Sequence, residues 1–133
     1  MSRLMLDTSA YAAFMRGHDD IRAVLQRAET ICVNPVILGE LLSGFMRGKR
    51  ERKNLEELRL FLASPRVKVV EIGEDTAERY AVIVNSLRDA GTPIPTNDIW
   101  IAASAMQHGL HVLTTDAHYR KVEHVLVAHF PVG

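Results

Sequence analysis

The sequence predicts an α/β domain built around a mostly parallel sheet of four or five strands, with helices on both faces. Short apolar segments alternate with segments of helical spacing, and no hairpin signal joins two neighbouring strands. Such alternation requires crossover connections, which leave neighbouring strands parallel. The apolar segments lack alternation with polar residues, as expected of strands buried on both faces. With 133 residues, 47% of them hydrophobic, the chain suits one domain, residues 1–133.

The predicted elements follow one another closely along the chain. Strands are predicted at residues 3–6, 30–33, 67–72 and 111–115, with a candidate fifth strand around 125–130. Helices are predicted at residues 8–15, around 21–28, from 35 to a weak end near 48, around 55–62, at 74–90 and around 98–110. The strands are recognised by their apolar and β-branched residues, and the helices by apolar residues three and four positions apart.

Local signals support several of the helix boundaries. Asn34 is a plausible N-cap, and Pro35 suits the first helical position because its missing N–H would be unpaired there. Gly91 is a C-terminal glycine for the helix at 74–90. One core stripe is expected in the helix after Asn34, made of Leu38, Leu41, Leu42 and Phe45. Another is expected in the helix before Gly91, made of Ala77, Tyr80, Ala81, Val84 and Leu87.

Composition excludes several broad classes of function. Sixteen basic and sixteen acidic residues give a formal net charge of zero, which argues against a generic polycation that coats nucleic acid. Cys32 is the only cysteine, so neither an internal disulfide nor a thiolate metal cluster is expected. No apolar run approaches the roughly 18 residues of a membrane span. Asp7 interrupts the N-terminal apolar run, so we expect no secretion signal, no membrane association and a cytoplasmic location.

One basic segment stands out against this balance. Residues 47–53 carry five bases and one acid, which is compatible with a solvated turn between two helices or with a contact for phosphates. The candidate nucleic-acid contacts in this segment are Arg47, Lys49 and Arg50.

Four carboxylates lie at or near the ends of predicted elements: Asp7, Glu40, Asp98 and Asp116. Functional groups of a parallel sheet gather beyond the carboxyl ends of its strands, so these four side chains are expected to meet. Each also has an ordinary explanation, because Asp7 can cap a helix, Asp98 can favour a helix dipole and Asp116 can shape a turn. Glu40 differs, because it lies in an apolar run next to Gly39, a residue that costs about 1 kcal/mol in a helix relative to alanine.

A cluster of carboxylates that repel one another calls for a divalent cation. Mg²⁺ and Mn²⁺ prefer oxygen ligands, and such ions can polarise a phosphoryl oxygen and activate water. The six histidines show no spacing typical of zinc ligands, and His118, two residues after Asp116, is the only one that merits attention. Thr8 and Ser9 have no histidine partner at a recognisable spacing, which argues against a serine nucleophile.

Four segments together resemble the PIN domain, and specifically the VapC toxin family of prokaryotic toxin–antitoxin pairs. They are Leu6-Asp7-Thr8-Ser9, Glu40-Leu41, the segment from Asn97 to Ala103, and Leu113-Thr114-Thr115-Asp116. The resemblance covers nearly the whole chain and implies a compact three-layer α/β/α sandwich. It also implies an endoribonuclease that depends on Mg²⁺ or Mn²⁺ and cleaves phosphodiesters with a metal-activated water, leaving a 5′-phosphate and a 3′-hydroxyl.

The same resemblance assigns roles to residues. Asp7 and Asp98 would be the most direct metal ligands, and Glu40 and Asp116 would complete the pocket, partly through water. Hydroxyl side chains that could bond a carboxylate or a metal-bound water are Thr8, Ser9 and Thr114. Departures from the family pattern occur at Asn34, Ile37 and Thr115. They concern residues around the quartet and leave the four acids in place.

The resemblance further implies partners: an RNA substrate, a second copy in a homodimer and a VapB-like antitoxin that wraps a hydrophobic groove. Candidate groove residues are Leu42, Phe45, Met46, Leu58 and Phe61, and all five could equally be core or dimer contacts. Two other classes of function were weighed. A phosphoacceptor receiver domain is disfavoured, because Asp7 is followed by Thr8 and not by a second acid. A non-catalytic PIN-like module that binds RNA or protein remains the alternative.

Overall fold

Five parallel strands form the centre of the structure, a computed structural model that describes residues 2–132. The strands are β1 (Arg3–Leu6), β2 (Thr30–Val33), β3 (Val67–Val69), β4 (His111–Thr114) and β5 (Val127–His129). Their order across the sheet is β3-β2-β1-β4-β5, and every neighbouring pair is parallel. The predicted α/β fold with a parallel sheet is therefore confirmed, and the segment near the C-terminus supplies the fifth strand.

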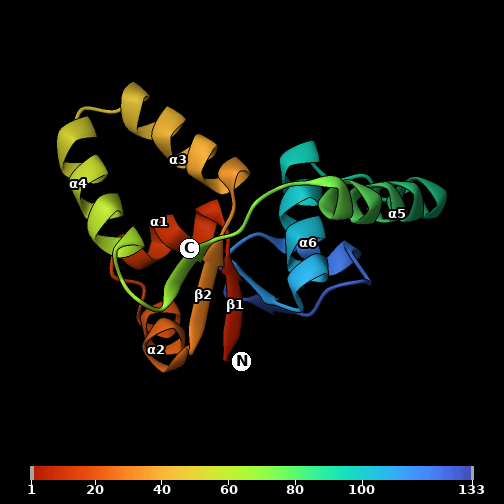
Figure 1. The fold of residues 1–133 in the computed structure, drawn as a ribbon, viewed down its shortest axis with the longest axis horizontal. Coiled ribbons are helices and arrows are strands. Elements are labelled where there is room, and N and C mark those ends of the chain that lie inside the picture. The colour runs from red at the N-terminus through yellow and green to blue at the C-terminus, as the bar shows by residue number, and fades with distance from the viewer. Residues whose placement is uncertain (1, 133) are drawn as a thin grey trace.

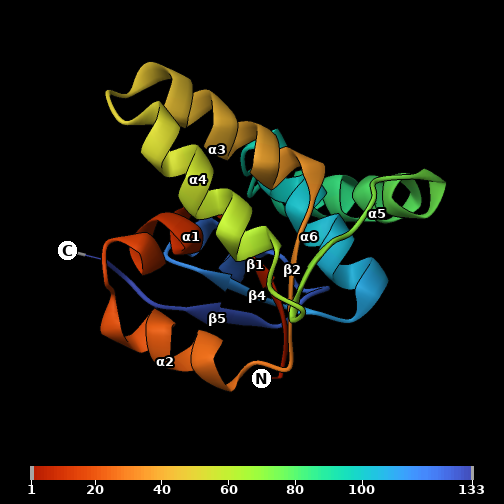
Figure 2. The ribbon, with the colours of Figure 1, turned by 60° about the vertical axis from the view of Figure 1, so that its left-hand side comes forward.

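Six α-helices and one short 3₁₀ helix connect the strands of this sheet. They are α1 (Thr8–Met15), α2 (Asp19–Arg27), α3 (Pro35–Arg47), α4 (Glu51–Leu62), α5 (Glu74–Ala90), α6 (Thr96–His108) and the 3₁₀ helix η1 (Ala117–Lys121). Helices α1 to α4 lie on one side of the sheet, and α5 and α6 lie on the other (Figure 1). Figure 2 shows α3 and α4 as an antiparallel pair that extends beyond the sheet. The strand order changes direction between β1 and β4, where ligands bind in open α/β sheets.

The buried side chain of Asn34 holds the start of α3 through two hydrogen bonds, one within α3 and one to α6. Asn34 is fully buried, and its Oδ1 accepts a hydrogen bond of 3.0 Å from the backbone N–H of Ile37, which confirms it as the N-cap. Its Nδ2 donates to Ser104 Oγ in α6, over 2.9 Å. This bond ties the first turn of α3 to α6 across the edge of the sheet. It thereby sets the position of Glu40, which lies farther along α3.

Some predicted details are wrong. Strand β3 ends at Val69 instead of residue 72, and Val69 is 47% exposed because β3 is an edge strand with a single neighbour. In α3, Leu41 is buried as predicted, but Leu42 is 40% exposed and the other buried residue is Ile37. In α5 the buried face is made of Thr76, Ile83 and Leu87, and the predicted core positions Ala77 and Ala81 are exposed.

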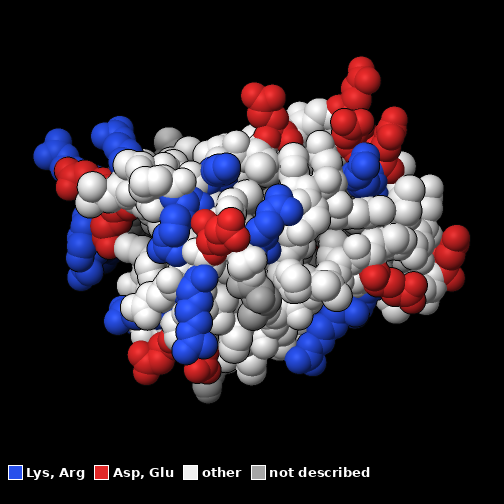
Figure 3. Space-filling view, turned by 60° about the horizontal axis from the view of Figure 1, so that its bottom comes forward, with Lys and Arg blue, Asp and Glu red and all other residues white. Residues whose placement is uncertain are grey.

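The distribution of charge agrees with the net charge of zero. Figure 3 shows Lys and Arg side chains interspersed with Asp and Glu on the face that it presents. Over residues 2–132, no helix combines the length and the apolar character that crossing a membrane requires.

Candidate metal centre

The most buried carboxylate of the predicted quartet belongs to Asp7, directly after β1. Its side chain is 3% exposed and accepts hydrogen bonds from three donors within the chain. The donors are the backbone N–H of Ala10 (2.8 Å), Ser9 Oγ to both oxygens (2.8 and 3.0 Å) and Thr114 Oγ1 (2.5 Å). Asp7 is thus the N-cap of α1 and is also held by the end of β4.

The environment of Asp7 disfavours its charged form. Burial raises the pKa of Asp7 from 3.8 to about 6, although the hydrogen bonds from Thr114, Ala10 and Ser9 act in the opposite direction. The negative charge of Asp98 raises the pKa further. Desolvation without a compensating positive charge is the dominant cause, so a cation beside Asp7 would restore its ionised form.

A second group joins two carboxylates through a histidine. His118 Nδ1 lies 3.0 Å from Asp98 Oδ2 and 3.0 Å from Asp116 Oδ1. Tyr119, which is fully buried, donates its hydroxyl to Asp98 Oδ1 over 3.2 Å. Burial raises the pKa of Asp98, and the charge of Asp116 contributes in the same direction, while hydrogen bonds from His118 and Tyr119 oppose the rise.

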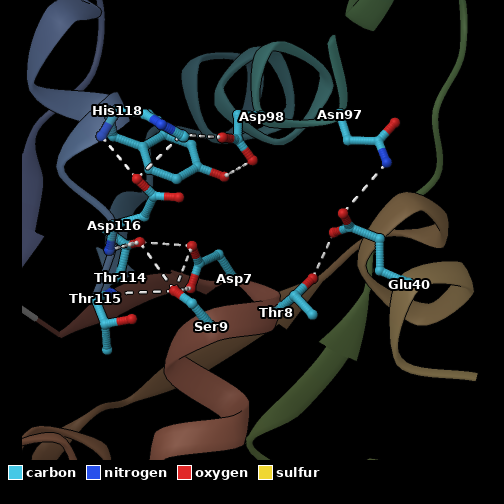
Figure 4. A network of polar contacts seen from close by, with 11 residues as sticks. Asp7, Thr8, Ser9, Glu40, Asn97, Asp98, Thr114, Thr115, Asp116 and His118 are labelled. Carbon is cyan, nitrogen blue, oxygen red and sulfur yellow. Dashed lines mark hydrogen bonds and ion pairs between the residues drawn. The ribbon is translucent and has the colours of Figure 1, made fainter. Parts of the chain in front are cut away.

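These two groups are continuous. Thr114 Oγ1 donates to Asp7 and accepts the backbone N–H of Asp116 over 2.9 Å, so one hydroxyl connects both carboxylate residues. Asp116 in turn accepts the backbone N–H of His118 and caps the 3₁₀ helix η1. Figure 4 shows Asp7, Asp98 and Asp116 arranged around the same opening. The sheet edge therefore brings together three of the four predicted acids.

Glu40 lies at the other side of this opening and has its own partners. Thr8 Oγ1 donates to Glu40 Oε1 over 2.5 Å, and Asn97 Nδ2 donates to Glu40 Oε2 over 3.2 Å. In Figure 4 no dashed line joins this set to the other three carboxylates. The two sets still act on one shared group, the hydroxyl of Tyr119. Burial raises the pKa of Tyr119 most, and the charges of Asp7, Asp98 and Glu40 raise it further.

The possible metal ligands form a narrower set than the quartet. One ligand atom each from Asp98, Asp116 and His118 all lie within 4.8 Å of one another. Asp7 lies outside this set, and both of its oxygens accept hydrogen bonds from the chain, as both oxygens of Asp98 do. Carboxylate oxygens suit Mg²⁺ and Mn²⁺, so the acids fit the predicted ions, while His118 Nδ1 lies between two of these carboxylates.

Three residues at the site carry contacts that the sequence pattern did not assign. The sequence singles out His118 by its spacing from Asp116, and the structure places it between two carboxylates. Tyr119 has no sequence signal beyond its place next to His118, and Asn97 belongs to the family-like segment from Asn97 to Ala103 but has no expected role there. Thr8, Ser9 and Thr114, which were expected to support the carboxylates, each donate a hydrogen bond to one.

The basic candidates and the groove candidates lie on α3, on α4 and in the turn between them. Arg47, Lys49 and Arg50 are exposed at the end of α3 and in that turn. Among the groove candidates, Leu58 is 4% exposed and Phe61 packs edge-on against Tyr11, with 5.3 Å between ring centroids, so both belong to the core. The remaining three lie differently: Met46 is 74% exposed, Leu42 is partly exposed, and Phe45 lines a pocket beside Tyr11.

Comparison with known proteins assigns the family. A family model described as PIN domain matches residues 4–125. Ribonuclease VapC4 of Mycobacterium tuberculosis is 35% identical over 95 residues, which cover 71% of this chain and 73% of the relative. The fold is similar to that in the crystal structure of VapBC2 from Rickettsia felis bound to a DNA fragment from their promoter. That match has a TM-score of 0.85 at 21% identity and covers 96% of this chain and 98% of the other.

A second solved structure supports the same fold. It is VapBC-5 of Mycobacterium tuberculosis, described as a member of the VapBC family of toxin-antitoxin systems. Its TM-score is 0.73 at 22% identity, and the match covers 99% of this chain and all of the other. Both structural likenesses concern the fold, whereas the family model and the relative with 35% identity concern the sequence. The chain belongs to the PIN domain family and, within it, to the VapC group.

Proposed function

We propose that this protein is a divalent-metal-dependent endoribonuclease and the toxin of a toxin–antitoxin pair, acting in the cytoplasm. The observation that carries the proposal is the meeting of Asp98 and Asp116 at His118, beside the buried Asp7. Buried or half-buried carboxylates in this arrangement repel one another, and a divalent cation offsets that repulsion. The relative with 35% identity is named a ribonuclease, which supports RNA as the substrate.

Each residue of the site has a role in this proposal. Asp98 and Asp116 would hold the cation together with Asp7, whose carboxylate is oriented by Ser9 and Thr114. Glu40 faces the opening from α3, where Thr8 and Asn97 orient its two oxygens. When bound, Mg²⁺ or Mn²⁺ would polarise the scissile phosphoryl oxygen and lower the pKa of the attacking water.

The chain's own groups would then orient the reacting atoms. His118 and Tyr119 restrain the two oxygens of Asp98, so the carboxylate keeps one rotamer as negative charge develops on the oxygens of the scissile phosphate. Such restraint reduces reorganisation in the transition state. Glu40 would accept a hydrogen bond from water on the substrate side, in agreement with its separate position.

The deciding experiment removes one negative charge from Asp98. We expect Asp98→Asn to abolish cleavage of RNA and arrest of growth without unfolding the protein, because amide oxygen binds Mg²⁺ less strongly than carboxylate. The matched control is Asp75→Asn, an exposed acid in the first turn of α5 that lies on a different helix. Circular dichroism would verify the fold of both variants.

Full cleavage by a folded Asp98→Asn protein would contradict the proposed chemistry. If the wild-type protein binds RNA but cleaves none in Mg²⁺ or Mn²⁺, the alternative of a non-catalytic PIN-like module would replace it.

The proposal includes an antitoxin, a second copy and RNA as partners. A pocket of about 190 Å³ between α1, α3 and α4 is lined by Tyr11, Met15, Leu41 and Phe45, with Asn54 and Glu57 at its polar side. The nearby exposed apolar residues Leu42 and Met46 extend this surface. Apolar area of this kind suits a VapB-like segment or a homodimer contact. The exposed bases Arg47, Lys49 and Arg50 suit the phosphates of RNA.

A further inference from the structure

A surface hollow of about 530 Å³ extends along α3, and Glu40 is the member of the quartet that lines it. Glu40 and Asn97 form the end that borders the metal centre. Gly39, Ser43 and Gly44 also line it, as does Arg47, the last residue of α3. This hollow, the α3 groove, therefore connects a residue of the quartet with one member of the basic segment.

No contact within the described chain requires glycine at two positions in the middle of α3. A Cβ added at Gly39 or at Gly44 would meet no other atom within 4 Å. Neither residue has a positive φ, so the backbone does not require glycine. Glycine is also among the poorest helix formers. What the two residues provide is a helix surface without side chains, where the backbone of another molecule can approach closely.

The lining of the α3 groove indicates which molecule approaches. Glu40 and Arg47 are its charged residues, and Val36 is its largest aliphatic side chain. A docked protein helix would be expected to meet larger apolar residues, as in interface cores. A polar path that ends in arginine suits a phosphate backbone instead. Seven residues separate Glu40 from Arg47, or roughly 10 Å along a helix, which is about the length of three stacked nucleotides.

We propose that the α3 groove holds the single-stranded RNA next to the scissile phosphate, with Arg47 bound to a backbone phosphate. The inference rests on the ribonuclease activity proposed above and adds the path of the substrate. Arg47 is a positioning residue in this view, because it binds substrate beyond the reacting phosphate. Lys49 and Arg50 belong to the same basic segment but do not line the groove.

The test fills the groove without disturbing the fold. Gly44→Leu places a side chain where the chain leaves open space. The control, Ala81→Leu, adds a similar bulk at an exposed position of α5. Affinity for a fluorescein-labelled single-stranded oligoribonucleotide is measured by anisotropy in the Asp98→Asn background, which prevents cleavage. We expect Gly44→Leu to weaken binding and to lower kcat/KM of the active enzyme about tenfold or more, whereas Ala81→Leu changes neither.

Charge provides an independent readout. Arg47→Ala should reduce the slope of log affinity against log salt by about 0.7, the value for one phosphate contact to a single strand. Lys49→Ala, at the neighbouring basic position, should have a smaller effect on the slope. The thermal shift caused by Mn²⁺ should stay at the wild-type value in Gly44→Leu and Arg47→Ala, because neither residue lies on an element that carries Asp98 or Asp116.

Three outcomes would overturn the proposal. The first is unchanged RNA affinity and kcat/KM in Gly44→Leu, and the second is an unchanged salt slope in Arg47→Ala. The third is a change from dimer to monomer in Gly44→Leu by light scattering with RNA affinity intact, which would make the groove a contact between copies. An inactive wild-type protein would reject the ribonuclease itself, whereas unaffected variants of an active enzyme would reject the groove alone.

Discussion

At the scale of single residues, Asp7 combines two demands that conflict. It caps α1 by accepting the Ala10 N–H, which requires it to lie at the helix start, and it is 3% exposed, which disfavours its charge. The raised pKa, about 6 against an ordinary 3.8, records this conflict. In the folded protein without metal, Asp7 therefore binds its proton more tightly than it does in the unfolded chain.

The first prediction follows from the sign of that shift. A carboxyl with a raised folded pKa adds stability that is fully present below about pH 4 and is lost as pH rises through about 6. With metal chelated, Asp7→Asn should raise the free energy of unfolding at pH 7, by on the order of 2–3 kcal/mol. The gain should shrink as the pH falls from 6 to 4. Urea unfolding of both proteins across this pH range measures it.

A matched substitution at an exposed position separates the effect of burying a carboxylate from the effect of changing Asp to Asn. Asp75→Asn removes an exposed carboxylate and should change the unfolding free energy little at any pH. The account of Asp7 would be wrong if Asp7→Asn were less stable than the wild type at pH 7, because its hydrogen bonds would then outweigh the cost of its buried charge.

The sequence identified those site residues whose positions follow from element ends. Asp7 and Asp116 come directly after strands, Asp98 opens a helix, and parallel strands bring such positions to one edge. The roles of Tyr119 and Asn97 were not predicted, because they depend on side-chain directions. Tyr119 contacts Asp98, 21 residues away in sequence, and Asn97 contacts Glu40, 57 residues away. The separation of Glu40 from the other acids depends on the tilt of α3, which the apolar pattern does not encode.

At the scale of elements, the pattern located helices better than it oriented them. Helix α5 buries Leu87 as expected, but it turns Thr76 and Ile83 inwards and leaves Ala77 and Ala81 exposed. Alanine and valine occur around most of this helix, so two faces had similar apolar character. The hydrogen bond from Thr76 Oγ1 to Gln107 of α6 is a long-range contact that selects one of them. The length of β3 was overestimated because the apolar residues Val70 and Ile72 follow Val69, which pairs with the last residue of β2.

The second prediction concerns the pocket between α1, α3 and α4. Tyr11 is 3% exposed, and its hydroxyl has no hydrogen-bond partner within residues 2–132. Burial, and then the charge of Glu57, raise the pKa of Tyr11 to about 12. An unpaired buried hydroxyl costs roughly 1–3 kcal/mol. In the free protein, Tyr11→Phe should therefore leave the midpoint of thermal unfolding unchanged or higher.

Tyr119→Phe is the matched comparison for that prediction. It removes a hydroxyl that donates to Asp98, so it should lower stability by about 0.5–1.5 kcal/mol. Calorimetry of the two variants ranks them. A loss in Tyr11→Phe as large as that in Tyr119→Phe would show that the Tyr11 hydroxyl is already satisfied in solution, and the pocket would then offer no free donor to a partner.

At the scale of the whole molecule, the chain is neutral overall but concentrates negative charge at one edge of its sheet. Asp7, Asp98 and Asp116 converge there, while acids and bases are mixed on the face shown in Figure 3. The hydrogen bonds from Ser9, Thr114 and Tyr119 hold the carboxylates in place without neutralising them. Folding therefore accepts electrostatic strain at the site, which a bound cation would relieve.

The last prediction measures that relief. A ligand that binds only the folded state stabilises it by about 2.7 kcal/mol when its concentration is a hundred times the dissociation constant. For a domain of this size, that corresponds to roughly 5–15 °C in the unfolding midpoint. Mn²⁺ or Mg²⁺ at millimolar concentration should raise the midpoint of the wild type, and chelation should reverse the rise. Asp98→Asn should reduce the shift strongly, whereas Asp75→Asn should retain it. If neither ion changes the wild-type midpoint, the carboxylates do not form a competent metal centre, and the proposed cleavage chemistry loses its basis.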